Sequence, residues 1–218
     1  MSGHMSALPQ RFRDWFALRG WAPHPHQEEM ARRSGDPALL LVAPTGGGKT
    51  MAGFLPTLAE LADGTRDGLH TIYVSRLKAL AADIRRNLRT PISEMDLPIR
   101  VEDRTGDTSQ TQKKRQRVDP PHILLTTPES LALLLTYEDA PRIFAGLSRV
   151  VVDEIHALHE SKRGDQLLLC LAELQAMCPG LRRVGLSATF EDPAGMARYL
   201  ARHPDPCHIV HADPGPAP

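Results

Sequence analysis

A glycine-rich turn between an apolar run and a helix-like segment is the first stretch of this sequence that could do chemistry. The apolar run at residues 39–42 has the composition of a strand buried on both faces. Glycines let successive backbone N–H groups face one concavity, and the start of the following helix adds partial positive charge. The stretch predicts a phosphate-binding loop, whose residues are Ala43, Pro44, Thr45, Gly46, Gly47, Gly48, Lys49 and Thr50.

The last two residues of this loop carry the side chains that a nucleoside triphosphate needs. Lys49 can reach the β- and γ-phosphates, and the Thr50 hydroxyl can bind Mg²⁺. The first position of the loop is Ala43, where the usual pattern has glycine. A chance glycine turn before a helix is the alternative interpretation.

A pair of adjacent carboxylates follows the apolar run at residues 150–152. Burying Asp153 and Glu154 at the end of a strand is costly unless they serve a cation or a proton transfer. Ligands of parallel sheets lie beyond the carboxyl ends of the strands, so we expect the pair beside the phosphate-binding loop. Asp153 would hold Mg²⁺ through water, and Glu154 would orient and deprotonate the attacking water. An ordinary helix N-terminus after a strand is the alternative.

The elements that must position these residues alternate between strands and helices. Strands are predicted at residues 39–42, 70–75, 99–101, 122–126, 150–152 and 183–186, with a possible edge strand at 207–210. Helices are predicted at residues 11–19, 26–30, 51–61, 77–88, 128–135, 165–177 and 194–201. This alternation predicts an α/β domain with a mostly parallel central sheet and helices on both faces.

Composition limits the functional class only weakly. The 26 Lys and Arg residues equal the 26 Asp and Glu residues, so net charge gives no argument for nucleic-acid or membrane binding. No apolar run approaches the roughly 20 residues that span a bilayer, so no membrane partner is expected. Three cysteines without CxxC spacing suit a reduced, cytoplasmic protein. The cluster of His203, Cys207, His208 and His211 is interpreted as a surface segment rather than a metal site.

Three blocks together resemble the first RecA-like domain of superfamily 2 helicases of the DExH type. They are the loop at residues 43–50, Asp153-Glu154-Ile155-His156 and Ser187-Ala188-Thr189. Other segments resemble the Lhr-like helicases, including the bacterial group associated with a DNA ligase. These segments are Gly20-Trp21-Ala22-Pro23 before Gln27, and residues 77–80, 104–108, 126–131 and 161–166. Arg76 departs from the pattern, because these proteins usually have proline there.

The resemblance covers about residues 12–202 and implies a RecA-like P-loop NTPase fold with ATP and Mg²⁺ as cofactors. We expect the helicase domain at residues 11–211. Residues 1–10 are interpreted as a disordered N-terminus or cloning remnant, and residues 212–218 as a linker-like tail.

The resemblance also gives roles to residues outside the loop and the carboxylate pair. The amide of Gln27 would donate to and accept from the adenine edge, and His156 would link the hydrolysis site to Ser187, Ala188 and Thr189. Judged by residue type alone, Gln27 could be an exposed helix residue. His156 could be a structural histidine at a strand end, with its ring nitrogens hydrogen-bonded within the protein. Ser187 and Thr189 could equally cap a helix.

By resemblance, six residues contact the backbone of one nucleic-acid strand: Lys78, Thr105, Gly106, Thr127, Pro128 and Glu129. Hydroxyls, backbone amides at helix N-termini and a lysine bind phosphates without reading bases. These groups therefore predict nucleic-acid binding that is independent of base sequence and weakened by salt. The basic run at residues 113–117 could extend this surface, but a solvated helix face is favoured. Lys162-Arg163 could contact nucleic acid or support the catalytic loop.

The resemblance implies the N-terminal motor domain of an ATP-dependent helicase or translocase, acting on single-stranded or partly duplex nucleic acid. DNA is expected rather than RNA, with 3′-to-5′ polarity. A second RecA-like domain of the same protein would supply arginine fingers, worth about 10³–10⁵ in rate. We therefore expect this sequence alone to be a monomer with weak ATPase activity. The alternatives are a nucleic-acid-binding switch without productive hydrolysis and a small-substrate kinase; the complete Asp153-Glu154 pair favours hydrolysis over the switch.

Overall fold

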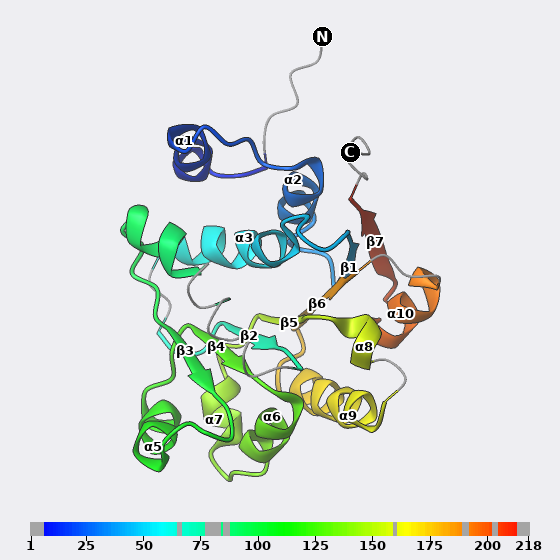
Figure 1. Ribbon diagram of the computed structural model, residues 1–218. Helices are drawn as coiled ribbons and strands as arrows, with labels where there is room; N and C mark the ends of the chain where they lie inside the picture. Colours follow the sequence, from blue (N-terminus) through cyan, green and yellow to red (C-terminus); the bar gives the residue numbers. More distant parts are fainter. Residues whose placement is uncertain are drawn as a thin grey trace.

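The computed structural model describes residues 7–64, 67–76, 84, 88–158, 161–188, 192–201 and 205–212. Within these residues, seven strands form one sheet in the order β3-β4-β2-β5-β6-β1-β7 (Figure 1). The strands are β1 (Ala38–Val42), β2 (Thr71–Val74), β3 (Val101–Arg104), β4 (Ile123–Thr126), β5 (Arg149–Val152), β6 (Arg182–Ser187) and β7 (Cys207–His211). Every neighbouring pair is parallel, which confirms the predicted sheet.

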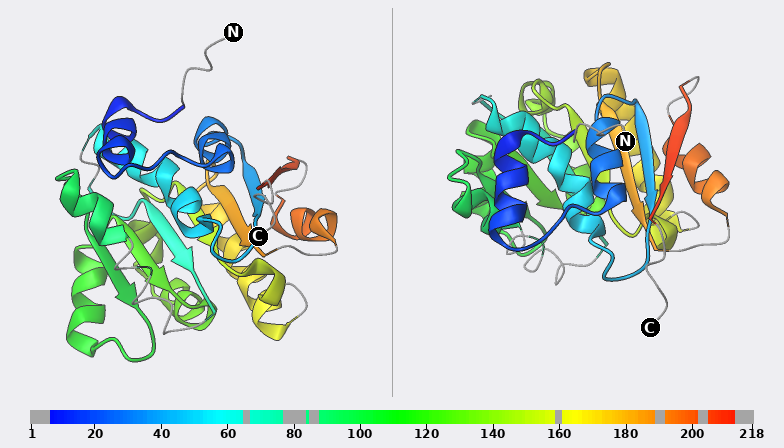
Figure 2. Two further views of the ribbon diagram at one scale, coloured as in Figure 1. Left: turned by 45° about the horizontal axis from the view of Figure 1, so that its top comes forward. Right: turned by 90° about the horizontal axis from the view of Figure 1, so that it is seen from above.

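Helices cover both faces of this sheet (Figures 1 and 2). One face carries α1 (Gln10–Leu18), α2 (Pro25–Arg32) and α3 (Lys49–Ala62). The other face carries α6 (Pro128–Leu135), α7 (Ala140–Phe144), α9 (Lys162–Met177) and α10 (Pro193–Leu200). Two further helices are α5 (Gln110–Val118) beside β3 and the single turn α8 (Ile155–Leu158) after β5.

The apolar core lies in two layers, one on each side of the sheet. In β1, Leu39 and Leu41 belong to the layer under α1 and α3, and Leu40 and Val42 belong to the layer under α9 and α10. All five residues of β1 are buried, so the strand needs apolar side chains at every position. Each such leucine stabilises the fold by about 1.5–3 kcal/mol. The continuous apolar run therefore reflects burial on both faces.

Some predicted boundaries are wrong. The third strand lies at Val101–Arg104 and not at residues 99–101. Its charged composition hides it, because the apolar pattern ends where the edge strand begins. The buried Arg104 belongs to it, and its guanidinium donates to the carbonyl of Lys113 at 3.0 Å.

The sequence predicts neither α7 nor α8, since each is too short to show a helical period. The predicted helix at residues 77–88 falls mostly outside the described residues, although residues 88–94 are helical. Helix α9 starts three residues earlier than the predicted position 165, because Ser161 caps it by accepting a hydrogen bond from the Gly164 N–H. The rest of the predicted element order is present.

Candidate active site

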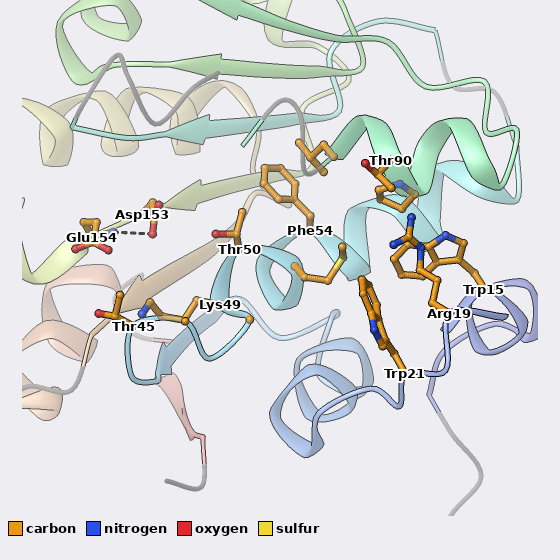
Figure 3. Close-up of a pocket in the computed structure, with 15 residues that line it drawn as sticks. Trp15, Arg19, Trp21, Thr45, Lys49, Thr50, Phe54, Thr90, Asp153 and Glu154 are labelled. Carbon is orange, nitrogen blue, oxygen red and sulfur yellow. Dashed lines mark hydrogen bonds between the residues drawn. The ribbon is translucent and has the colours of Figure 1, made fainter. Parts of the chain in front are cut away.

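A cavity of about 510 Å³ opens beyond the carboxyl ends of the strands, where the predicted phosphate-binding loop and carboxylate pair meet. One end is lined by Thr45, Lys49, Thr50, Asp153 and Glu154 (Figure 3). The other end is lined by Trp15, Arg19 and Trp21, which come from α1 and the segment after it. The structure thus brings together two motifs that are about a hundred residues apart in the chain.

The loop has the backbone conformation that its glycines allow. Gly46 and Gly48 have φ values of 81° and 70°, a left-handed region that other residues rarely adopt. A Cβ atom at Gly48 would also lie 2.8 Å from Nε2 of Gln27. The Lys49 ammonium donates to the carbonyls of Ala43 and Pro44, each at 3.0 Å. Lys49 therefore crosses the loop, with its charge over the concavity.

Gln27 is buried against this loop, with only 3% of its surface exposed. Its Oε1 accepts from the His24 N–H at 2.9 Å, and its Nε2 donates to the Gly48 carbonyl at 3.4 Å. The interpretation of Gln27 as an exposed helix residue is wrong. Its amide fixes the start of α2 against the phosphate-binding loop.

The two carboxylates have different surroundings. Asp153 is 4% exposed; its Oδ1 accepts from the Glu154 N–H at 2.9 Å and its Oδ2 from the Tyr73 hydroxyl at 2.5 Å. Burial raises the pKa of Asp153 above its usual value, although the Tyr73 hydrogen bond opposes this shift. Glu154 is partly exposed and has a φ of 51°, a strained backbone for a residue with a side chain. Such strain is common where a side chain must point into a site.

His156 connects this carboxylate pair to the end of β6. Its Nε2 lies 3.1 Å from a Glu154 carboxylate oxygen, and its Nδ1 lies 3.2 Å from the Ser187 hydroxyl. Because Nδ1 also accepts from the Ala188 N–H at 3.3 Å, the neutral ring carries its proton on Nε2 and donates to Glu154. The side chain thus spans the two motifs.

The helix-cap interpretation of Ser187 is wrong. Ser187 is fully buried, and α10 is instead capped by Asp192, whose side chain accepts from the Gly195 N–H at 2.8 Å. Thr189 lies outside the described residues.

Five of the six predicted nucleic-acid residues lie where β3 and β4 end side by side. Thr105 follows β3, and its hydroxyl accepts from the Asp107 N–H at 3.3 Å. Thr127 follows β4 and caps α6, accepting from the Ser130 N–H at 3.4 Å. The helix then begins with Pro128 and Glu129, and Gly106 is exposed beside Thr105. Lys78 lies outside the described residues.

The neighbouring basic residues make contacts within the protein. Lys113 donates to the Gly106 carbonyl at 3.1 Å, and Arg115 pairs with Glu102. Arg117 pairs with Asp139 at 2.8 Å and lies 4.0 Å from the ring centre of Tyr137. The run at residues 113–117 thus lies on helix α5 and supports the loop after β3. Arg163 pairs with Glu129, which joins α9 to the start of α6.

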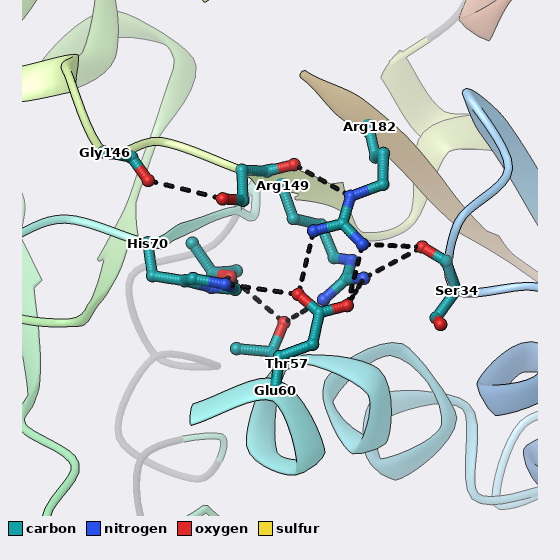
Figure 4. Close-up of polar contacts among 9 residues, drawn as sticks. Ser34, Thr57, Glu60, His70, Gly146, Arg149 and Arg182 are labelled. Atoms are coloured by element: carbon teal, nitrogen blue, oxygen red, sulfur yellow. Dashed lines mark hydrogen bonds and ion pairs between the residues drawn. The ribbon is translucent and has the colours of Figure 1, made fainter. Parts of the chain in front are cut away.

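Sequence reasoning missed two groups behind the site. Tyr73, on β2, was hidden in an apolar strand, although a hydroxyl among buried residues is a signal that a polar partner is near. Glu60 is the second. The Glu60 side chain lies between Arg149 and Arg182, which stand at the amino ends of β5 and β6 (Figure 4). Its Oε1 is 2.7 Å from a guanidinium nitrogen of each arginine.

Glu60 is held as an anion by several partners. Burial alone would raise its pKa, but the hydrogen bonds from His70 and Arg182 and the charge of Arg149 bring it far below its usual range. Arg149 is only 1% exposed, and burial lowers its pKa to about 10. One carboxylate therefore fixes α3, which starts at Lys49, to β5, which Asp153 follows, and to β6, which ends at Ser187.

Two negative findings apply to the described residues. No group of three or more His, Cys, Asp or Glu side chains there could hold a metal ion. No helix in that part of the chain is long and apolar enough to cross a membrane.

Comparison with known proteins identifies the family. The family model of the DEAD/DEAH box helicases matches residues 24–196. The Lhr helicase/probable uracil glycosylase of Mycolicibacterium smegmatis is 42% identical over 214 residues, covering 91% of this chain and 14% of the relative. The ATP-dependent helicase Lhr-Core of Methanothermobacter thermautotrophicus is 44% identical over 179 residues, covering 74% of this chain and 20% of the relative. This chain therefore spans less than a quarter of the length of these relatives.

Solved structures agree on the fold. A structure of the Mycobacterium smegmatis helicase Lhr bound to ssDNA and AMP-PNP has a TM-score of 0.85 and 40% identity, covering 94% of this chain and 28% of that chain. The DEAD-box helicase Mss116 shares the fold with a TM-score of 0.78 at 18% identity, covering 94% of this chain and 44% of that chain. The predicted RecA-like fold and the resemblance to Lhr helicases are confirmed, and the chain belongs to the DEAD/DEAH box helicase family.

Proposed function

We propose that this chain is the first motor domain of an ATP-dependent helicase that acts on DNA, in the cytoplasm, with 3′-to-5′ polarity. The observation that carries the proposal is the His156 bridge, which joins Glu154 at the cavity to Ser187 and Ala188 at the end of β6. A domain that only bound nucleotide would not need this connection. The DNA preference rests on the 40%-identical Lhr helicase, which was solved with ssDNA.

The chemistry of the site fits ATP with Mg²⁺. Mg²⁺ prefers oxygen ligands, and the cavity offers the Thr50 hydroxyl and the buried Asp153 carboxylate. When bound, the cation would neutralise charge that develops on the phosphates. The backbone N–H groups of residues 45–50 and the Lys49 ammonium would hold the phosphates, while Glu154 would orient and deprotonate the attacking water. Gln27 would contact the adenine edge while it supports the loop.

The hydrolysis site is proposed to be coupled to nucleic acid through His156 and the Ser187-Ala188-Thr189 segment. On the same edge of the sheet, Lys78, Thr105, Gly106, Thr127, Pro128 and Glu129 are proposed to hold the backbone of one strand. A second RecA-like domain of the same protein would complete the ATP site, which agrees with the small share of the relatives that this chain spans. The chain alone is proposed to be a monomer with weak ATPase activity.

The experiment that tests this function is ATP hydrolysis by the full-length protein, with and without single-stranded DNA or RNA. Strong stimulation by DNA is expected, since the nucleic-acid residues are proposed to be coupled to Glu154. Stimulation by RNA alone would contradict the DNA assignment. Stimulation by neither, with ATP still bound, would instead support a nucleotide-dependent binding switch.

Replacing Lys49 with alanine is expected to weaken ATP binding by about 10–100-fold, because a hydrogen bond to a charged group contributes about 1.5–3 kcal/mol. The measurement is a titration of this chain with a fluorescent ATP analogue. Lys114→Ala is the control, because Lys114 is exposed on α5, a helix that contributes no residue to the cavity lining. Equal affinity in the two variants would show that Lys49 does not hold the phosphates.

Replacing Thr127 with alanine is expected to weaken binding of single-stranded DNA by roughly three- to tenfold, as one hydrogen bond is lost. Thr127 is neutral, so the dependence of affinity on salt should stay the same. Asp192→Ala is the matched control, because it also removes a helix cap but lies at α10. If both variants kept the parental affinity in a DNA titration, the proposed nucleic-acid surface would be misplaced.

A further inference from the structure

Tyr73 lies under the candidate cation site, although it belongs to neither the phosphate-binding loop nor the carboxylate motif. It is the third residue of β2 and stands opposite Val151 of β5, two residues before Asp153. The side chain is 1% exposed, and its ring stacks on Phe54 of α3 with 4.7 Å between ring centres. Its position is therefore set by the sheet on one side and by the helix of the phosphate-binding loop on the other.

The Tyr73 hydroxyl holds one of the two groups that would bind the cation. It donates to Oδ2 of Asp153 at 2.5 Å, and Asp153 lines the same cavity as Thr50. The other carboxylate oxygen of Asp153 accepts from the Glu154 N–H at 2.9 Å. Both oxygens of this buried carboxylate are therefore held by the protein.

We propose that Tyr73 is a positioning residue for the divalent cation, because its hydroxyl holds the Asp153 carboxylate facing Thr50. This inference rests on the proposed function, since it assumes that nucleotide binds with a cation. It adds a residue that acts through Asp153.

The Tyr73 hydroxyl would favour cation binding because it preorganises the Asp153 carboxylate. A carboxylate held in the productive orientation loses little freedom when a cation arrives, so more of the binding energy is realised. Each carboxylate oxygen has two lone pairs, so Oδ2 can keep the Tyr73 bond and still accept from a cation-bound water. Without the hydroxyl, Asp153 would be buried with the Glu154 N–H as its one remaining hydrogen-bond donor among the contacts described here.

Tyr73→Phe removes this hydroxyl and keeps the ring that stacks on Phe54. The readout is the affinity of this chain for a fluorescent ATP analogue, measured in EDTA and again with Mg²⁺ in excess. The ratio of the two affinities reports how strongly the cation supports nucleotide binding. We expect Tyr73→Phe to lower this ratio by about tenfold, as for loss of a hydrogen bond to a charged group, with unchanged affinity in EDTA.

Tyr199→Phe is the control, because it also removes a tyrosine hydroxyl, here a partly buried one that donates to the Gly164 carbonyl at 2.7 Å. This variant should keep the parental ratio even if its melting temperature falls. An unchanged ratio in Tyr73→Phe would overturn the inference, and a larger ratio would show that the hydroxyl competes with the cation. If the parental chain bound the analogue without any effect of Mg²⁺, the proposed function itself would fail.

Discussion

In the full-length protein, Glu154→Gln is expected to bind ATP with parental affinity and to hydrolyse it about 10²–10⁴-fold more slowly, the usual contribution of a general base. The substitution removes the group that would take a proton from the attacking water. It changes little else, because a glutamine side chain has the same shape and its carbonyl can still accept from Nε2–H of His156. Binding should therefore be separated from hydrolysis.

The measurement is DNA-stimulated phosphate release at saturating ATP, together with a titration by a fluorescent ATP analogue. Glu173→Gln is the control, since Glu173 is exposed on α9 and does not line the cavity. Parental hydrolysis by Glu154→Gln would remove Glu154 as the base. Loss of binding as well would mean that Glu154 holds the nucleotide or the local backbone.

The chemistry at the end of each strand could be predicted from local sequence. A run such as residues 39–42 followed by glycines and Lys49 constrains the backbone within a few residues, so the loop can be recognised without knowing the rest of the fold. The parallel sheet then follows from the alternation of strands and helices. This is why Lys49 and Asp153 were expected at one edge of the sheet and were found there.

Contacts between distant segments could not be predicted in the same way. Tyr73 and Asp153 are 80 residues apart, and although a hydroxyl in an apolar strand signals a polar partner, the local sequence does not say that the partner is Asp153. The position of the edge strand β3 was predicted wrongly because its residues are charged. Its contacts with α5, such as those of Arg104 with Lys113 and of Glu102 with Arg115, explain why that composition is tolerated. Such pairings depend on the register between strands, which local patterns do not encode.

The contacts of Glu60 also join distant segments and could not be predicted from local sequence. Among the substitutions proposed for this protein, removal of Glu60 should lower the free energy of unfolding the most. Glu60→Ala is expected to destabilise the chain by about 3–5 kcal/mol, because it leaves the buried Arg149 without its counter-charge. For a chain of this size, that corresponds to a fall of roughly 6–20 °C in melting temperature. Glu60→Gln should recover only part of the loss, since it restores hydrogen bonding without the charge.

The loss of stability caused by Glu60→Ala should also depend on pH. A carboxyl group whose folded-state pKa lies below its unfolded value stabilises the fold above the unfolded pKa, and this stability disappears as the pH falls through the folded value. The pKa of Glu60 is strongly lowered, so its contribution is complete at neutral pH. The gap between the melting temperatures of the parental chain and Glu60→Ala should therefore be constant near neutrality and narrow in acid.

Glu29→Ala is the control, because it tests whether the effect of removing a glutamate depends on the burial of its arginine partners. Glu29 also pairs with two arginines, and its side chain is 29% exposed against 27% for Glu60. The difference lies in the partners, because the side chain of Arg149 is 1% exposed whereas those of Arg32 and Arg33 are 59% and 27% exposed. Surface pairs contribute little, so Glu29→Ala should melt near the parental temperature. If both variants melted together, the buried ion pair would not be what holds α3 to β5 and β6.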